Sequence, residues 1–423
     1  MKEKILIIQD GLFGIPDANA KLVWRLSEHL TGLGYDVTML GKASSNEHVA
    51  EYHGVHLIHE PVDIAIRECR LSEQLGKWKR LRYLVSWRAI SYWLNKENID
   101  PFVIEMRRWL KHHVREYDVL IACCSPYYPI LLASEVANRI PVIYYKIDPM
   151  GSWGNKNGRD VELSTVENEV KWDNVAMRIM MPDVVYKDYM RMETKINGGK
   201  VTIVQFPNVR PLKVISYQSS VISSLLSAFS GQCNLLFVGT FYADIRHPQY
   251  LFDLMEKLED TGITLHIVGP INNRRFGRDY INKYFTNKIE NIRYHGIVSP
   301  AEADALLLQA DVLVHVGNAV DSLMPSKILD YISSGKPILN ICKIRTCPTI
   351  PLMERYPMGM TIFEDELLDA KKVEAIKEFC LTNKGKQVPY EQIEKLYPEC
   401  TIEYVGKQFD ETIQEAIKEF KQK

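Results

Sequence analysis

The sequence predicts an α/β protein built from two doubly wound, Rossmann-like domains, and three observations carry this prediction. Short apolar runs alternate with segments of helical apolar spacing along most of the chain. The 423 residues are enough for two or three domains of about 150 residues each. A Ser-rich stretch interrupts the alternation within 206–232, where we expect the two domains to be joined.

The N-terminal domain is expected over 1–210. An apolar run at 5–9 ends at Asp10-Gly11, apolar residues then recur at helical spacing over 18–33, and a second strand follows at 35–40. This is a βαβ unit with a right-handed crossover, so its sheet should be parallel. Further strands are expected at 55–58, 119–122, 141–145 and 201–204.

The C-terminal domain is expected over 211–402. Its predicted strands are 235–239, 264–269, 292–296, 311–316 and 337–341, and its predicted helices are 250–258, 302–309 and 325–333. The tail over 403–423 has apolar residues at nearly helical spacing, so we expect a closing helix there that returns to the N-terminal domain.

Composition excludes several classes of protein. The hydrophobic fraction of 46% and the charged fraction of 25% are those of a folded chain, and a net charge of −1 gives no global attraction to nucleic acid. The eight cysteines include no C-x-x-C pair, which favours reduced thiols over a zinc knuckle. No run approaches about 18 apolar residues and no signal peptide is recognisable, so we expect a cytoplasmic protein.

Three common phosphate-binding signatures are missing from the sequence. The loop Asp10-Gly11-Leu12-Phe13-Gly14 does not match the G-x-G-x-x-G dinucleotide fingerprint, and a P-loop is absent. No Asp-x-Asp pair occurs to bridge a metal ion to a diphosphate. The spacing of His53, His56 and His59 puts alternate rings on opposite faces of a strand, which argues against a metal site.

An ordered series of motifs in the second half is more specific. In chain order, these motifs are 237–241 with Arg246, 266–269, 294–299, 310–314 and 324–338. The series resembles the nucleotide-sugar domain of GT-B glycosyltransferases, especially the glycosyltransferase family 4 group that builds bacterial surface polysaccharides. The GT-B resemblance implies two Rossmann-like domains that face a cleft, with the acceptor on the first domain and the nucleotide sugar on the second.

Physical arguments favour an anion site in this domain. Pro325 suits a first helical position, and the free N–H groups and dipole of that helix end would attract a diphosphate. Arg246 and Lys327 could clamp the phosphates, and the alternatives for both are solvated surface cations. We expect Arg246 and Lys327 to carry catalysis by stabilising the leaving diphosphate.

The resemblance also implies binding roles. Asp330 matches the acidic residue that accepts hydrogen bonds from ribose hydroxyls, and Gly296 and Ile297 follow the strand after which relatives hold the base. Asp330 could instead be only a solvated carboxylate on a helix, and Gly296 could be only a turn glycine. The residues expected to bind the nucleotide sugar are Gly11, Gly14, Gly239, Thr240, Gly269, Gly296, Ile297, Asp321, Ser322, Leu323, Met324, Ser326 and Asp330.

The sequence departs from the family at two positions. The family has two Glu residues separated by seven others, and here Ser322 stands in the first place with Asp321 one residue out of register. The family also often has Arg and Lys six residues apart after its first strand, and here Thr240 stands in the Arg place.

In the N-terminal domain, Asp148 follows a strand and could orient the acceptor or act as a base, or only cap a turn before Pro149.

One segment has an unusual charge. Residues 67–115 contain twelve Lys and Arg against five acidic residues, a net charge of +7, with Trp, Tyr and Leu side chains interleaved. This mix is typical of binding to an anionic lipid surface, although a solvated face over packed helices, or base stacking on nucleic acid, explains the same residues.

The sequence therefore predicts a glycosyltransferase, retaining and independent of metal, that moves a hexose-type sugar from a nucleotide diphosphate sugar to a glycan or polyprenyl-linked acceptor. It is expected in the cytoplasm, or peripherally at the inner membrane face, with no tightly bound cofactor and no nucleic-acid partner. Two alternatives stay open: a catalytically silent GT-B-like partner subunit, and a GT-B-like sugar-nucleotide epimerase.

Overall fold

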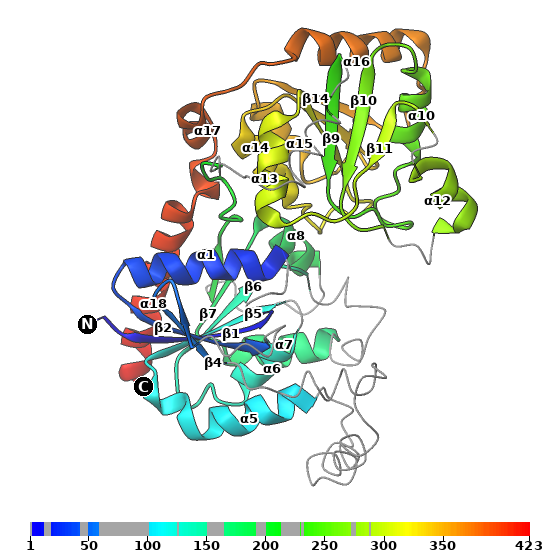
Figure 1. Ribbon diagram of the computed structural model, residues 1–423. Helices are drawn as coiled ribbons and strands as arrows, with labels where there is room; N and C mark the ends of the chain where they lie inside the picture. Colours follow the sequence, from blue (N-terminus) through cyan, green and yellow to red (C-terminus); the bar gives the residue numbers. More distant parts are fainter. Residues whose placement is uncertain are drawn as a thin grey trace. The chain divides into compact units, whose positions relative to one another are not determined.

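A computed structural model gives the structure of residues 2–11, 18–42, 50–58, 101–124, 127–149, 165–191, 200–212, 229, 232–271, 276–286 and 289–423. These residues form two units with separate cores (Figure 1). The first unit comprises Met1–Pro207 and Ile402–Lys423, and the second comprises Asn208–Thr401. The sequence predicts the corresponding divisions at 210/211 and 402/403.

The first unit contains a sheet in the order β3-β4-β2-β1-β5-β6-β7-β8. All of its pairings are parallel except the one between β3 and β4 at the edge. Burial on both faces explains the continuous apolar run of β5, which is buried throughout. The strands are β1 (Lys4–Gly11), β2 (Asp36–Lys42), β3 (Glu51–Tyr52), β4 (Val55–Ile58), β5 (Val119–Cys124), β6 (Val142–Lys146), β7 (Arg178–Met181) and β8 (Val201–Ile203).

Helices complete the first unit, and the last of them comes from the C-terminal end of the chain. Helix α18 (Ile402–Lys421) packs on α1, β5 and β6, where Phe409 meets the ring of Tyr145 edge to face at 5.0 Å. The closing helix is therefore confirmed as an element of the N-terminal unit. The other helices are α1 (Ala18–Gly32), α5 (Pro101–His113), α6 (Tyr128–Ser134), α7 (Val166–Val175) and α8 (Asp183–Arg191), with a 3₁₀ turn at Val114–Glu116.

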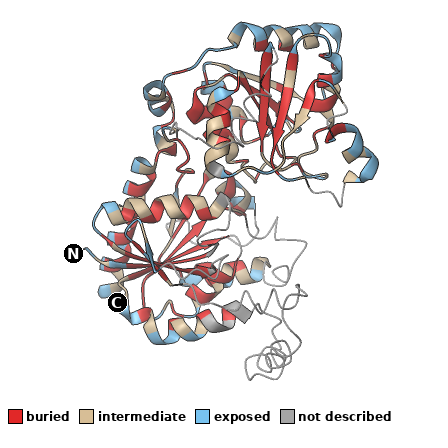
Figure 2. Ribbon diagram, in the orientation of Figure 1, coloured by how far each residue is buried: buried red, intermediate tan, exposed pale blue. Residues whose placement is uncertain are grey.

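The second unit contains an all-parallel sheet in the order β11-β10-β9-β12-β13-β14. The chain order reverses between β9 and β12, and open α/β sheets bind ligands beside the carboxyl ends of strands at such a point. Figure 2 shows the strands buried between helices. The strands are β9 (Cys233–Val238), β10 (Ile263–Val268), β11 (Ile292–Tyr294), β12 (Val312–Val316), β13 (Ile338–Cys342) and β14 (Gly359–Phe363).

Helices also connect the strands of the second unit. Ser299 caps α13 reciprocally with Glu302, as a capping box does, and Gly335 ends α14 in the left-handed conformation. The helices are α10 (Gln249–Lys257), α12 (Arg278–Tyr284), α13 (Pro300–Gln309), α14 (Lys327–Ser334), α15 (Ile350–Arg355), α16 (Ala370–Asn383) and α17 (Tyr390–Leu396), with a 3₁₀ turn at Pro398–Cys400.

The predicted α/β fold with two doubly wound sheets is confirmed, and two details are corrected. Pro325 does not occupy the first helical position, because α14 begins at Lys327 after the cap Ser326. The carbonyls of Pro325 and Ser326 accept i+3 hydrogen bonds from Ile328 and Leu329, so the chain turns before the α-helix begins. The edge pairing of β3 with β4 is antiparallel, whereas we expected a parallel N-terminal sheet.

Candidate functional site

Three of the predicted glycines lie together at the carboxyl edge of the second sheet. The Gly239 N–H donates to the Val268 carbonyl at 2.9 Å, and the Gly269 N–H donates to the Gly296 carbonyl at 2.7 Å. A Cβ on Gly269, whose φ is +135°, would lie 2.0 Å from the Gly239 carbonyl oxygen. Only glycine fits this approach, so the loops after β9, β10 and β11 present a compact backbone surface.

Arg246 lies in the loop between β9 and α10 and is fixed by neutral partners. Its Nε and Nη2 donate to the Oδ1 of Asn318 at 3.0 and 2.7 Å, and its Nη1 reaches the Thr240 carbonyl at 3.4 Å. Within the described ranges the guanidinium forms no ion pair with a carboxylate. The structure therefore brings Arg246 and Thr240 together, through the backbone carbonyl of the threonine.

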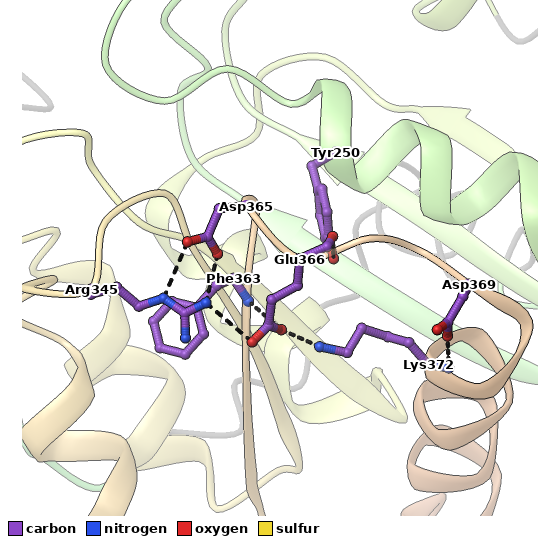
Figure 3. Close-up of polar contacts among 7 residues, drawn as sticks. All are labelled: Tyr250, Arg345, Phe363, Asp365, Glu366, Asp369 and Lys372. Carbon is purple, nitrogen blue, oxygen red and sulfur yellow. Dashed lines mark hydrogen bonds and ion pairs between the residues drawn. The ribbon is translucent and has the colours of Figure 1, made fainter.

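Other cations of this unit have acidic partners. Arg345, in the loop after β13, pairs with Asp365 at 2.8 Å and Glu366 at 3.3 Å, and its guanidinium covers the Phe363 ring at 3.8 Å (Figure 3). In the same view Lys372 pairs with Glu366. These charges neutralise one another, whereas Arg246 keeps its positive charge available for an anion.

The surroundings of Arg246 are buried and polar. Burial lowers the pKa of Arg246, and the groups that act in the opposite direction are Tyr242, Tyr331 and Cys347 and not a carboxylate. Burial, together with the charge of Arg246, lowers the pKa of His315 to about 3, so that ring is neutral at physiological pH. A partly buried guanidinium that meets only amide and carbonyl oxygens attracts phosphate oxygens strongly, because these are charge-assisted acceptors.

Asn318 is a site residue that sequence reasoning missed. It lies in the loop after β12, where its Nδ2 donates to the Leu323 carbonyl at 2.9 Å while its Oδ1 accepts from Arg246. The neighbouring Ala319 N–H donates to the Ile245 carbonyl at 2.7 Å, which joins the same two loops through the backbone. The sequence signal, an Asn two residues after a buried strand that ends at Val316, is too common to single out.

Helix α14 carries predicted residues in its first turn. Lys327 pairs with Asp330 at 3.3 Å, and Arg210 lies 3.8 Å from the same carboxylate, which is 8% exposed. Arg210 also pairs with Asp304 at 2.7 Å. Asp330 is thus a carboxylate held between two cations, and sequence reasoning missed Arg210 because it precedes β9 by more than twenty residues.

The segment before α14 contains the altered family position. Ser322 is 3% exposed, so a small buried side chain fills the place of the first Glu. Asp321 beside it is only partly buried, as are Leu323 and Met324, and Ser326 caps α14 through its backbone alone. Ile297, in the loop after β11, is 74% exposed.

The predicted residues of the first unit lie at the carboxyl ends of its strands. Gly11 ends β1 and pairs with Lys42, and Gly14 lies outside the described residues. Asp148 follows β6, where its Oδ2 accepts from Asn19 Nδ2 of α1 at 2.6 Å and its carbonyl accepts from the Cys124 thiol at 3.5 Å. Asn19, in the first turn of α1, is a third residue that sequence reasoning missed.

Within the ranges that the structure describes, no three His, Cys, Asp or Glu side chains gather closely enough to hold a metal ion. The helices of those ranges include none that is both long and apolar enough to cross a bilayer. Most of the basic segment, residues 67–100, and His59 lie outside the described residues; in α5, Arg107 pairs with Glu135 at 2.7 Å.

Comparisons with known proteins agree with this architecture. Residues 232–345 match the family model described as Glycosyl transferases group 1. The chain is similar in structure to HepE of Anabaena, solved with UDP and glucose, at 12% identity and a TM-score of 0.64, with 98% of this chain and 100% of that chain covered. No curated protein matches the sequence.

Two further solved structures are similar. Sucrose-phosphate synthase from Thermosynechococcus elongatus matches at 13% identity and a TM-score of 0.64, with 98% and 99% of the two chains covered. WaaG, a glycosyltransferase involved in lipopolysaccharide biosynthesis, matches at 14% identity and a TM-score of 0.55, with 95% of each chain covered. Residues 232–345 thus form a group 1 glycosyltransferase domain within a chain of GT-B fold, and we identify the protein as a glycosyltransferase.

Proposed function

We propose that this glycosyltransferase moves a hexose-type sugar from a nucleotide diphosphate sugar to a glycan or polyprenyl-linked acceptor, with retention and without a metal ion. The observation that carries the donor assignment is Arg246, a partly buried cation held by Asn318 and lacking an acidic partner in the described part of the second unit. A diphosphate supplies the missing negative charge at that point.

The bound donor extends from this cation along the sheet edge. Its diphosphate lies against the backbone of Gly239, Thr240 and Gly269, and against the amino end of α14 with Ser326. Asp330 accepts hydrogen bonds from the ribose hydroxyls, and Gly296 and Ile297 hold the base. The transferred sugar meets the segment Asp321, Ser322, Leu323 and Met324.

Catalysis is mainly electrostatic. The bond between the anomeric carbon and the diphosphate oxygen breaks, and Arg246 and Lys327 stabilise the charge that develops on the leaving group. The acceptor hydroxyl attacks on the face that the leaving group departs from, and its proton passes to a phosphate oxygen. Asp148, oriented by Asn19, positions the acceptor, and the glycines Gly11 and Gly14 allow the reacting phosphate a close approach to the backbone.

The acceptor class has two supports of its own. WaaG, which has the same fold, is involved in lipopolysaccharide biosynthesis. The basic and aromatic segment 67–115 suits an anionic membrane surface, where lipid-linked acceptors reside, and this supports a peripheral location at the inner membrane face. Nucleic acid is not a partner in this proposal.

The test compares turnover of two arginine variants. We would measure release of nucleoside diphosphate from sugar nucleotides with wild-type enzyme, Arg246→Gln and the matched control Arg345→Gln, whose arginine lies in the same unit with two acidic partners. The proposal requires turnover in wild type, loss in Arg246→Gln and little change in Arg345→Gln.

The same assay separates the alternatives. Conversion of one sugar nucleotide into another without release of diphosphate would show an epimerase. Absence of both reactions would favour the silent partner subunit, for which the buried Ser322 in place of the first Glu is the supporting observation.

A further inference from the structure

A chain of four polar side chains runs through the second unit beside its sheet. Asp311 precedes β12, Asn234 lies in β9, His266 lies in β10, and His295 follows β11. The Oδ2 of Asp311 accepts from the Asn234 backbone N–H at 2.8 Å and from its Nδ2 at 3.1 Å. The Oδ1 of Asn234 lies 3.3 Å from His266 Nε2, and His266 Nδ1 lies 2.9 Å from His295 Nε2.

The donor and acceptor properties of these four side chains fix the direction of each hydrogen bond between them. A carboxylate accepts only, so the NH₂ of Asn234 faces Asp311 and its carbonyl oxygen faces His266. His266 therefore carries its proton on Nε2 and accepts on Nδ1. His295 must then donate from Nε2, which leaves its Nδ1 without a proton in the neutral ring.

Burial keeps both rings neutral. His266 is fully buried, and burial lowers its pKa to about 3, with further lowering by His295 and Arg293. Burial and Arg293 also lower the pKa of His295. The His266 ring stacks on Phe229 at a centroid distance of 4.1 Å, and the His295 ring lies edge to edge with it, nearly coplanar, at a centroid distance of 5.2 Å.

The end of this chain lies where the backbone leaves the sheet. The His295 N–H donates to the Ile267 carbonyl at 2.9 Å, and the next residue, Gly296, has a φ of +74° and accepts from the Gly269 N–H. Ile297 beyond it is 74% exposed. His295 is thus fixed by its backbone and its side chain directly before a segment with an exposed side chain.

We infer that Asn234 and His266 are positioning residues, which fix the His295 side chain and through it the 296–299 segment for binding the nucleotide base. This inference rests on the proposed function, because it takes that segment as the base site. Asn234 on β9 and His266 on β10 should therefore affect the affinity for the nucleoside but not the affinity for the diphosphate.

The test removes the hydrogen bonds and keeps the packing. His266→Phe retains a ring between Phe229 and His295 but leaves Asn234 Oδ1 and His295 Nε2 without partners. His266→Gln can donate to one and accept from the other, so it should rescue. Phe229→Leu is the matched control, because it removes the ring stack and leaves the hydrogen bonds.

Two readouts are measured on the full chain. Calorimetric titration with a nucleoside diphosphate and with inorganic pyrophosphate separates the base from the diphosphate. We expect His266→Phe to bind the nucleoside diphosphate about tenfold more weakly, with pyrophosphate affinity unchanged and with wild-type affinities in His266→Gln and Phe229→Leu. Nitrogen chemical shifts of selectively labelled histidine should show the Nε2–H tautomer for His266 and His295 in wild type, and mixed tautomers for His295 in His266→Phe.

Each failure has a distinct meaning. If wild type binds no nucleoside diphosphate, the proposed function fails and the inference with it. If wild type binds and His266→Phe binds equally well, or loses both ligands equally, the inference alone is overturned. The opposite tautomer of His295 in wild type would also overturn it.

Discussion

Replacing Arg246 by glutamine should abolish most catalysis and leave the fold intact. The guanidinium makes two hydrogen bonds to Asn318 Oδ1 and one to a carbonyl, and it has no acidic partner in the described ranges. Removing one charge-assisted contact to the leaving diphosphate should cost on the order of 2 to 4 kcal/mol, or a roughly 30- to 1000-fold loss of kcat/KM.

The expected effect on stability is small because two terms oppose each other. Loss of the Asn318 contacts costs about 1 kcal/mol per hydrogen bond, and removal of an unneutralised, partly buried charge offsets that cost. We therefore expect the free energy of unfolding to change by less than about 1 kcal/mol in a denaturant titration.

The control for this experiment is Arg345→Gln. Its arginine pairs with two carboxylates and covers Phe363, so its loss should affect surface packing and leave kcat/KM within about twofold of wild type. Unchanged kcat/KM in folded Arg246→Gln would refute the assignment of Arg246. Equal losses in both variants would point to a general requirement for cations.

Three other predictions test separate parts of the account. Burial raises the pKa of Asp173 to about 6 from its ordinary 3.8, so between these values the folded chain holds a proton that the unfolded chain releases. The free energy of unfolding should therefore fall as pH rises from about 4 to about 6. Denaturant titrations should show a flatter pH profile in Asp173→Asn than in wild type, and an equal slope in both proteins would count against the shift. Asp321→Asn should weaken use of the sugar nucleotide about tenfold or more in steady-state kinetics while binding of the free nucleoside diphosphate is retained; equal losses would indicate a role in loop order. The segment 67–115 should carry the protein onto anionic vesicles at low salt in a sedimentation assay, and Lys79→Glu with Arg80→Glu should release it; wild type that stays in solution would leave only a solvated face.

Much of the fold could be predicted from sequence because its strands are short apolar runs between helical patterns. The runs at 235–239 and 311–316 become β9 and β12, whose continuous burial needs no tertiary information to recognise. The strands β3, β7 and β14 were not predicted, and β3 is only two residues long. β7 is four residues of which two are Met, and β14 lies at a sheet edge with one fully buried residue, so neither gives a strong pattern.

The candidate site could be predicted only where a residue has a strong local signal. Arg246 follows a Gly-terminated strand, and the structure gives it the contacts of a fixed cation. Asn318 contacts Arg246 across more than seventy residues of sequence, and Arg210 contacts Asp304 across more than ninety. The pattern within one chain segment gives no information on such pairings. The start of α14 was placed two residues early because Pro325 is compatible with both a turn and a first helical turn.

The central claim is that the second unit binds a nucleoside diphosphate at Arg246, and a thermal-shift panel tests it most directly. Wild type and Arg246→Gln would each be heated with a series of nucleoside diphosphates and their sugars. At about 100 times the dissociation constant, a bound ligand stabilises the folded chain by roughly 2.7 kcal/mol. The account predicts that at least one nucleoside diphosphate raises the Tm of wild type and that the shift is lost in Arg246→Gln. A wild-type Tm that no member of the panel raises, or an equal shift in both proteins, would contradict it.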